Sequence, residues 1–142
     1  MRQRAVSQSR LPEGGVPKNA LISIVDDDES VREATKGLLK SLGFSAESFA
    51  CAEDFLSSIR LPRTTCLIVD VQMPGMSGLD LHRQLLAAGK SIPTILITAY
   101  PDERTRARAL KAGVICYLVK PFTESDLLNC LRAILGEDPK GP

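Results

Sequence analysis

Residues 21–29 of the chain read LISIVDDDE, an apolar run that leads directly into four acidic side chains. A short apolar run rich in β-branched residues is typical of a buried strand. The residues that follow carry apolar side chains at helical spacing, and Gly43 stands where such a helix would end. This stretch therefore predicts a buried strand, an acidic turn and an amphipathic helix.

The same alternation of strand and helix patterns runs on to residue 135. We expect further strands over 45–49, 66–69, 92–97 and 116–119, and further helices over 52–59, 79–88, 103–112 and 123–135. Phe55, Leu56 and Ile59 are expected on the inner face of the second helix. Strands that are apolar throughout need cover on both faces, and their alternation with helices indicates right-handed crossovers. The predicted fold class is α/β, with a doubly wound, five-stranded parallel sheet.

Length and composition fit a single globular domain. The chain has 142 residues, of which 44% are apolar and 25% charged, so it can bury a core. Its 18 basic and 17 acidic residues almost cancel, which argues against binding of nucleic acid or membrane surfaces through bulk charge. No apolar run approaches the ~20 residues of a membrane-spanning helix. Because the first residues lack the apolar stretch of a secretory signal, we expect a cytoplasmic protein with no membrane partner.

Metal-binding patterns of cysteine and histidine are not found in the sequence. The four cysteines are Cys51, Cys66, Cys116 and Cys130, and no two of them have the spacing of a CxxC pair. The single histidine, His82, has no partner at ligand spacing. We therefore expect no zinc site, and we expect reduced thiols that are buried or half-buried.

Composition divides the chain into three segments. Residues 1–19 hold four basic residues, one acidic residue, two prolines and a glycine pair, and we interpret them as a flexible basic arm. Residues 20–136 are expected to form the folded domain, and residues 137–142 a polar tail. A DNA-binding helix-turn-helix does not fit after Leu135, so we expect no DNA-binding domain in this chain, whether it is free-standing or truncated.

Polar side chains stand where the predicted strands end. Asp26 and Asp27 follow the first strand, Asp70 the third, Thr98 the fourth and Lys120 the fifth. In doubly wound sheets the carboxyl ends of the strands form the ligand site. Carboxylates within ~4–6 Å disfavour each other's ionised forms, and a hard divalent cation with oxygen ligands relieves this. The pattern therefore predicts a Mg²⁺ site built from the three aspartates.

This combination of groups suits phosphoryl chemistry. An aspartate beside Mg²⁺ and a lysine can act as a nucleophile and become an acyl phosphate, with catalysis supplied by positioning and charge neutralisation. Structural alternatives exist for each residue taken alone. Residues 26–28 would serve as a helix cap, Asp70 as a turn residue, Thr98 as an ordinary hydroxyl at a strand end and Lys120 as a solvated loop lysine.

Four local segments carry a resemblance to a known family: IVDDD at 24–28, VDVQMPGMSG at 69–78, ITA at 97–99 and KPF at 120–122. In this order and spacing they resemble the receiver domains of two-component response regulators, most of all the FixJ/NarL type. The resemblance covers residues 21–135. It implies the flavodoxin-like (βα)5 fold of CheY, with strand order 2-1-3-4-5.

The resemblance also implies roles for individual residues. Asp70 would accept the phosphoryl group from a histidine kinase, in a Mg²⁺-dependent reaction. Asp27 would bind the ion directly, Asp26 largely through water, and Gln72 through its backbone carbonyl. Lys120 would pair with a phosphoryl oxygen.

A second set of implied roles concerns the switch. Thr98 would contact another phosphoryl oxygen and draw its loop inward, and Tyr117 would then swing inward; the alternative for Tyr117 is a half-buried strand tyrosine with its hydroxyl in water. The Lys120-Pro121 bond would be cis. Gln72 and Tyr100 depart from the residues usual at their positions, which bears on phosphoryl lifetime and on the amplitude of the switch.

The resemblance implies a signalling role with its own phosphoryl chemistry. We expect no enzyme but a phosphoacceptor with intrinsic self-phosphorylation and autodephosphorylation. Its output face would be the helix over 103–112, the strand over 116–119 and the last helix, used for homodimerisation or partner binding.

Other functions fit the sequence less well. A phosphohydrolase or phosphotransferase with an aspartyl nucleophile needs a second acid two residues later, where this chain has Gln72. A flavodoxin-like cofactor binder needs a phosphate loop rich in Ser, Thr and Gly, whereas here the loop is acidic and would repel a phosphate. A degenerate receiver is disfavoured because the set of three aspartates, Thr98 and Lys120 is intact.

Overall fold

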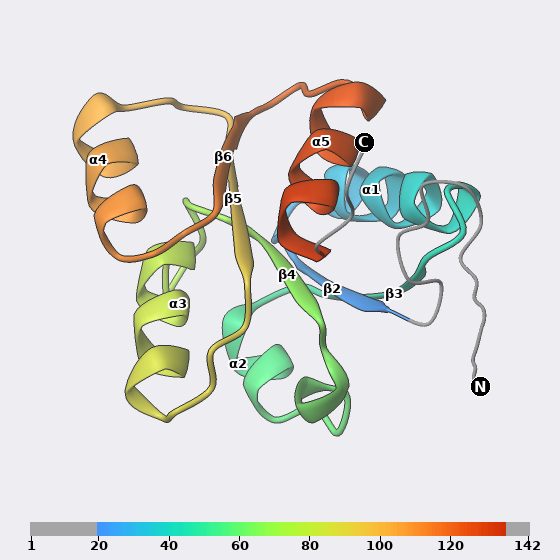
Figure 1. Cartoon of the computed structure of the whole chain (residues 1–142). Helices are drawn as coiled ribbons and strands as arrows, with labels where there is room; N and C mark the ends of the chain where they lie inside the picture. Colours follow the sequence, from blue (N-terminus) through green and yellow to red (C-terminus); the bar gives the residue numbers. More distant parts are fainter. Residues whose placement is uncertain (1–19, 136–142) are drawn as a thin grey trace.

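A computed structural model describes residues 20–135 of the chain (Figure 1). The strands are β2 (Leu21–Val25), β3 (Ser45–Phe49), β4 (Cys66–Asp70), β5 (Thr94–Thr98) and β6 (Cys116–Val119). The helices are α1 (Glu29–Ser41), α2 (Ala52–Leu56), α3 (Gly78–Ala87), α4 (Glu103–Lys111) and α5 (Glu124–Leu135), with a 3-10 turn over Leu61–Arg63. The expected arm at 1–19 and tail at 137–142 lie outside the described residues.

All strand pairs in the sheet are parallel, in the order β3-β2-β4-β5-β6. Counted along the chain, this is the predicted order 2-1-3-4-5. Asp70 lies opposite Ile97, and Thr98 lies opposite Val119, so the strands end together at one edge. The predicted α/β fold class and sheet are confirmed.

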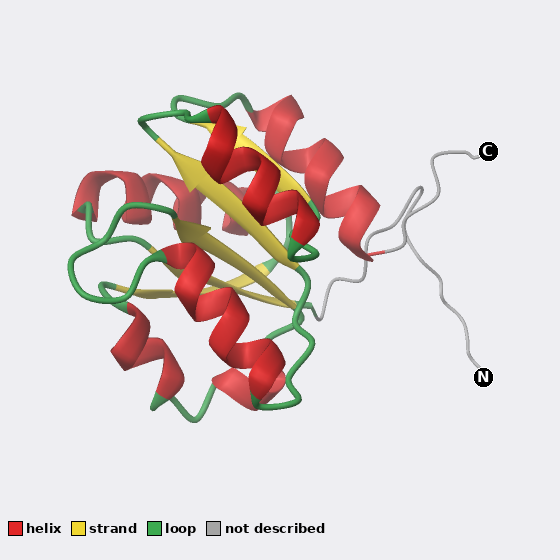
Figure 2. Ribbon diagram, turned by 90° about the vertical axis from the view of Figure 1, so that its left-hand side faces the viewer, coloured by secondary structure: helices red, strands yellow, loops and turns green. Residues whose placement is uncertain are grey.

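Helices cover both faces of the sheet, as Figure 2 shows. On one face, α1 and α5 bury Leu39 and Leu127 against Ile22, Ile24 and other strand residues. On the opposite face, α2, α3 and α4 pack against the alternate residues of the same strands. Because successive strand residues point to opposite faces, each strand serves both layers, which explains its continuous apolar run.

Two predicted features differ from the structure. The second helix ends at Leu56, and Ile59 is 86% exposed, so its expected inward position is wrong. The hydroxyl of Ser57 donates to the carbonyl of Glu53, and that of Ser58 accepts from the N–H of Arg60, so local side-chain bonds compete with the helix.

The fourth strand begins at Thr94 rather than at residue 92. Pro93 has no N–H to donate to a neighbouring strand, although its carbonyl accepts from Leu67. The predicted start was therefore two residues early.

Local signals at the carboxyl edge match the sequence closely. Thr123 and Asp126 form a reciprocal cap of α5, with the N–H of each donating to the side chain of the other at 3.1 and 3.0 Å. Gly78 begins α3 where an added Cβ would overlap the carbonyl oxygen of Asp70. A glycine there lets α3 start directly beside the end of β4.

Cysteine burial also agrees with the sequence. All four cysteines are unpaired; Cys66 and Cys130 are buried, and Cys51 and Cys116 are half-buried. Burial raises the pKa of the Cys66 thiol to about 12, which makes it a poor nucleophile. Between residues 20 and 135, the helices are too short or too polar to span a bilayer.

Candidate functional site

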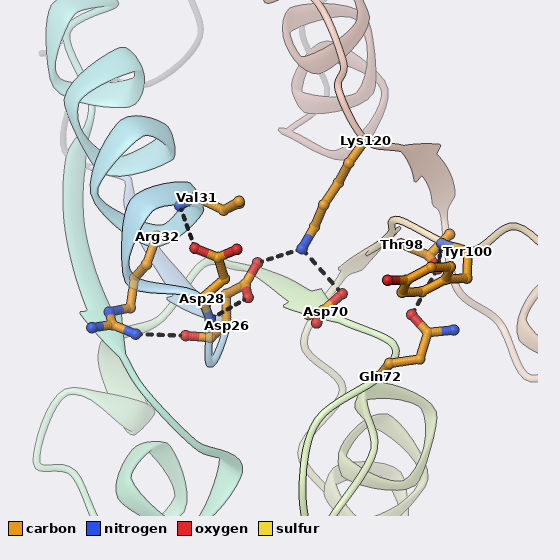
Figure 3. A network of polar contacts seen from close by, with 9 residues as sticks. All are labelled: Asp26, Asp28, Val31, Arg32, Asp70, Gln72, Thr98, Tyr100 and Lys120. Atoms are coloured by element: carbon orange, nitrogen blue, oxygen red, sulfur yellow. Dashed lines mark hydrogen bonds and ion pairs between the residues drawn. The ribbon is translucent and has the colours of Figure 1, made fainter.

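The sheet brings the predicted polar residues to one edge. Asp70 and Thr98 are the last residues of β4 and β5, Asp26 and Asp27 follow β2, and Lys120 follows β6. Figure 3 shows Lys120 reaching between Asp26 and Asp70, with Thr98 on the far side of Asp70. The strand ends that the sequence marked as a site therefore lie together.

Three carboxylates form the centre of this edge. One oxygen from each of Asp26, Asp27 and Asp70 lies within 4.8 Å of the others. Asp26 and Asp70 are buried, whereas Asp27 is exposed. Such a group of oxygen ligands, open on one side, has the chemistry of a site for a hard divalent cation.

Lys120 is the cation that the chain itself places among these carboxylates. Its Nζ lies 3.0 Å from Asp26 Oδ2 and 3.4 Å from Asp70 Oδ1, and its side chain is 14% exposed. The Lys120-Pro121 peptide bond is cis, as the resemblance implied. One lysine facing two buried carboxylates leaves the cluster with net negative charge.

Burial and the neighbouring charges shift the pKa values of Asp70 and Lys120. Burial, followed by the nearby charge of Asp26, raises the pKa of Asp70 to about 6, while Lys120 pulls it down. Burial lowers the pKa of Lys120, but its contacts with Asp26 and Asp70 outweigh burial and raise it above the ordinary value.

Two buried carboxylate oxygens of the cluster have no polar partner other than Lys120 within residues 20–135. Apart from their ion pairs with Lys120, Asp26 Oδ2 and Asp70 Oδ1 make no hydrogen bond within residues 20–135. Buried carboxylate oxygens normally find such partners. These oxygens, together with Asp27, fit a bound Mg²⁺.

Asp28 has a different role from its two neighbours. Its carboxylate accepts from the N–H of Val31 at 3.2 Å and caps α1. Its own N–H donates to Asp26 Oδ1 at 2.9 Å, and the guanidinium of Arg32 donates to the carbonyl of Asp26 at 2.8 Å. The capping alternative therefore holds for Asp28, whose position in turn fixes the Asp26 side chain.

Thr98 has a partner that sequence reasoning missed. Its hydroxyl donates to Gln72 Oε1 at 2.8 Å and accepts from the N–H of Tyr100 at 3.0 Å. Tyr100 is 72% exposed, and its ring lies beside them (Figure 3). The position of Gln72, two residues after the strand end, marked it as close to the site, but nothing in the sequence showed that its side chain reaches Thr98.

Tyr117 lies half-buried on β6, opposite Leu96 of β5, and packs against the buried cluster that α2, α3 and α4 form with the sheet. Its hydroxyl is buried and has no hydrogen-bond partner in the described part of the chain. The alternative with the hydroxyl in water is therefore wrong.

Comparison with known proteins assigns the chain to a family. A family model described as "Response regulator receiver domain" matches residues 22–132. The chain belongs to this family. It is thus a receiver domain of two-component signalling, and such domains generally act as signalling modules rather than enzymes and generally depend on Mg²⁺.

Individual relatives support the same assignment for this receiver. The response regulator protein TodT of Pseudomonas putida is 43% identical over 121 residues, which are 85% of this chain and 53% of TodT. The transcriptional regulatory protein FixJ of Azorhizobium caulinodans is 35% identical over 122 residues, which are 85% of this chain and 57% of FixJ. The chain thus spans about half the length of these curated relatives.

A solved structure agrees with the fold of the receiver. The response regulator StyR matches with a TM-score of 0.76 and 45% identity, over 83% of this chain and 60% of the StyR chain. Together with FixJ, this match confirms the predicted receiver fold and family.

Proposed function

We propose that Asp70 of this receiver accepts a phosphoryl group from a histidine kinase in a Mg²⁺-dependent reaction. The observation that supports this most is the position of Lys120 Nζ between the carboxylates of Asp26 and Asp70, 3.4 Å from Asp70 Oδ1. An aspartate with a cation at that distance and a second cation site beside it is suited to hold a dianionic phosphoryl group.

The transfer follows from this placement. An oxygen of the Asp70 carboxylate attacks phosphorus, the O–P bond forms as the bond to the phosphohistidine nitrogen breaks, and the imidazole leaves with the bonding electron pair. Lys120 faces the developing negative charge without having to move far. Asp26 keeps the lysine in position through the 3.0 Å ion pair.

The metal would be held by Asp27 directly, Asp26 largely through water, Asp70 itself and the backbone carbonyl of Gln72. When bound, Mg²⁺ neutralises charge on the phosphoryl oxygens and on the three carboxylates. The buried Asp26 Oδ2 and Asp70 Oδ1, whose only polar partner within residues 20–135 is Lys120, support this set.

We further infer that phosphorylation changes the face formed by α4, β6 and α5. Thr98 would donate to a phosphoryl oxygen, and Tyr117 on β6 would respond. Apolar side chains of Leu110, Ile115 and Val119 are between 42% and 47% exposed on this face, which favours a protein partner or a second copy of the chain. The helix α4 also carries four exposed basic residues, Arg104, Arg106, Arg108 and Lys111.

The remaining parts of the proposal follow from this chemistry. The domain over 20–136 would be a phosphoacceptor with self-phosphorylation and autodephosphorylation rather than an enzyme acting on other substrates. It would meet its kinase in the cytoplasm. The phosphohydrolase alternative gains no support, because Gln72 holds an amide where that chemistry needs an acid.

Acetyl phosphate labelling tests the proposal. We expect a single phosphoryl adduct by intact-mass spectrometry when Mg²⁺ is present, and none in the Asp70→Asn variant. The exposed Asp54 on α2 offers a matched control, because Asp54→Asn removes a carboxylate that belongs neither to the aspartate cluster nor to the ion pairs of Lys120. Undiminished labelling of Asp70→Asn would refute the assignment.

A further inference from the structure

The hydroxyl of Thr98 already uses its single proton in a local hydrogen bond. It donates its proton to Gln72 Oε1 at 2.8 Å and accepts from the N–H of Tyr100 at 3.0 Å (Figure 3). A hydroxyl has one proton to donate. Thr98 can therefore donate either to Gln72 or to a phosphoryl oxygen, but not fully to both.

We propose that the side chain of Gln72 is a latch that opposes the phosphorylated state by holding the Thr98 hydroxyl. This proposal rests on the proposed function, since it concerns the phosphoryl group on Asp70. It assigns to the Gln72 side chain a positioning role that is separate from any metal contact of its backbone.

The surroundings of the two residues suit such a latch. Thr98 is fully buried, and its carbonyl accepts from the N–H of Lys120 at 2.8 Å, so its backbone is fixed at the sheet edge. Gln72 is exposed in the loop that connects β4 to α3. Release therefore requires movement of the Gln72 side chain or rotation of the Thr98 hydroxyl, and leaves the sheet intact.

A groove beside the latch offers room for the released amide. It has a volume of about 670 Å³ and lies between α3 and α4. Gln72 is one of its lining residues, and its polar lining includes Asp80 and Arg83 from α3 and Arg108 from α4. A freed Gln72 side chain can thus be solvated or make new hydrogen bonds there, which keeps the cost of release low.

The latch can be measured with beryllofluoride and Mg²⁺, which mimic a phosphoryl group on aspartate. In Gln72→Leu the side chain keeps a similar volume but has no acceptor for the Thr98 proton. We expect beryllofluoride to bind this variant about 5-fold more tightly, the order of one net hydrogen bond. Beryllofluoride is not lost by hydrolysis in the way a phosphoryl group is, so this affinity is independent of any effect of Gln72 on an attacking water.

Two controls separate the latch from a general effect on folding. Gln84→Leu changes an exposed glutamine on α3 and should leave the affinity for beryllofluoride unchanged. In a Thr98→Val background the hydroxyl is gone, so adding Gln72→Leu should have no further effect on that affinity. A structural role of Gln72 would instead persist in this background.

Equal or weaker binding of beryllofluoride to Gln72→Leu, with normal labelling of Asp70 by acetyl phosphate, would refute the latch and leave the proposed function standing. Loss of both labelling and beryllofluoride binding in the unmodified chain would overturn the proposed function and the latch together.

Discussion

The two ends of the parallel sheet differ in how far their buried polar groups find hydrogen-bond partners. Near the amino end, the hydroxyls of Ser23 and Thr64 are 2.7 Å apart, and His82 contacts the Thr94 hydroxyl and the carbonyl of Ala112, each at 3.1 Å. At the carboxyl end, the buried Asp26 Oδ2 and Asp70 Oδ1 have only the Lys120 ammonium as a polar partner within residues 20–135, at 3.0 and 3.4 Å. The buried hydroxyl of Tyr117, on β6, has no hydrogen-bond partner in the same residues.

This difference separates stability from function within one set of strands. The amino end satisfies its buried polar groups, as stable cores do. The carboxyl end keeps like charges together and leaves acceptors open, a local cost in stability that creates a site for a cation and a phosphoryl group. Removing a polar group at the amino end should therefore lower the free energy of unfolding, and removing one of the unsatisfied groups at the carboxyl end should raise it. Lys120 is an exception, because it is the cation that neutralises the carboxylates.

The largest expected effect is at Lys120, the cation of the carboxyl end. Lys120→Met leaves two buried carboxylates without their cation, so we expect the free energy of unfolding in Mg²⁺-free buffer to fall by about 3 kcal/mol. Urea unfolding measures this. The exposed Lys111 on α4 gives the control, since Lys111→Met should change stability by less than about 0.5 kcal/mol. Equal losses for both variants would argue that Lys120 does not stabilise the cluster.

At the amino end, Thr94→Val should lower the free energy of unfolding by about 2 kcal/mol, because it leaves a buried ring nitrogen of His82 without its partner. A double variant that carries both Thr94→Val and His82→Leu tests the contact between the two side chains. Because both polar groups are then replaced, it should lose less than the sum of the two single variants. Simple additivity would show that the contact between His82 and Thr94 contributes nothing.

The third variant, Asp70→Asn, should be more stable than the unmodified chain. Asp70→Asn removes one of three neighbouring negative charges, so we expect the free energy of unfolding without Mg²⁺ to rise by about 1 kcal/mol. Thermal unfolding should also show a smaller gain from added Mg²⁺ than in the unmodified chain. Asp54→Asn should change neither quantity. A loss of stability in Asp70→Asn would contradict the view of this end as strained by like charges.

The smallest effect is expected at Tyr117. Tyr117→Phe removes a buried hydroxyl without a partner, so the free energy of unfolding should rise by up to about 1 kcal/mol. Tyr100→Phe is the control, because that side chain is 72% exposed. A clear loss of stability in Tyr117→Phe would mean that its hydroxyl has a partner after all.

The fold and the positions of the main site residues could be predicted from the sequence. Apolar runs that alternate with helical patterns predicted the parallel sheet, because strands buried on both faces leave few alternatives. The strand order was predicted only from the resemblance to receiver domains. The placement of Asp26, Asp70 and Lys120 at one edge followed from topology alone. Competition between local side-chain hydrogen bonds and the helix was harder to predict. The bonds of Ser57 and Ser58 accompany the early end of α2, and Ile59 therefore lies outside the core.

Side-chain pairing at the site could not be predicted either. The bond between Thr98 and Gln72 joins residues 26 positions apart, and it depends on how the loop after β4 folds. The unpartnered hydroxyl of Tyr117 depends in the same way on packing against α4. Such contacts depend on tertiary structure, which motif and spacing do not specify.

The most direct test of the central claim is to locate the acyl phosphate chemically. The unmodified chain is incubated with acetyl phosphate and Mg²⁺, reduced with borohydride and sequenced by tandem mass spectrometry. An aspartyl phosphate is thereby converted to homoserine. We predict this product at position 70 alone, and only when Mg²⁺ is present; the product at position 26 or 27, or equal yield after removal of Mg²⁺, would contradict the account.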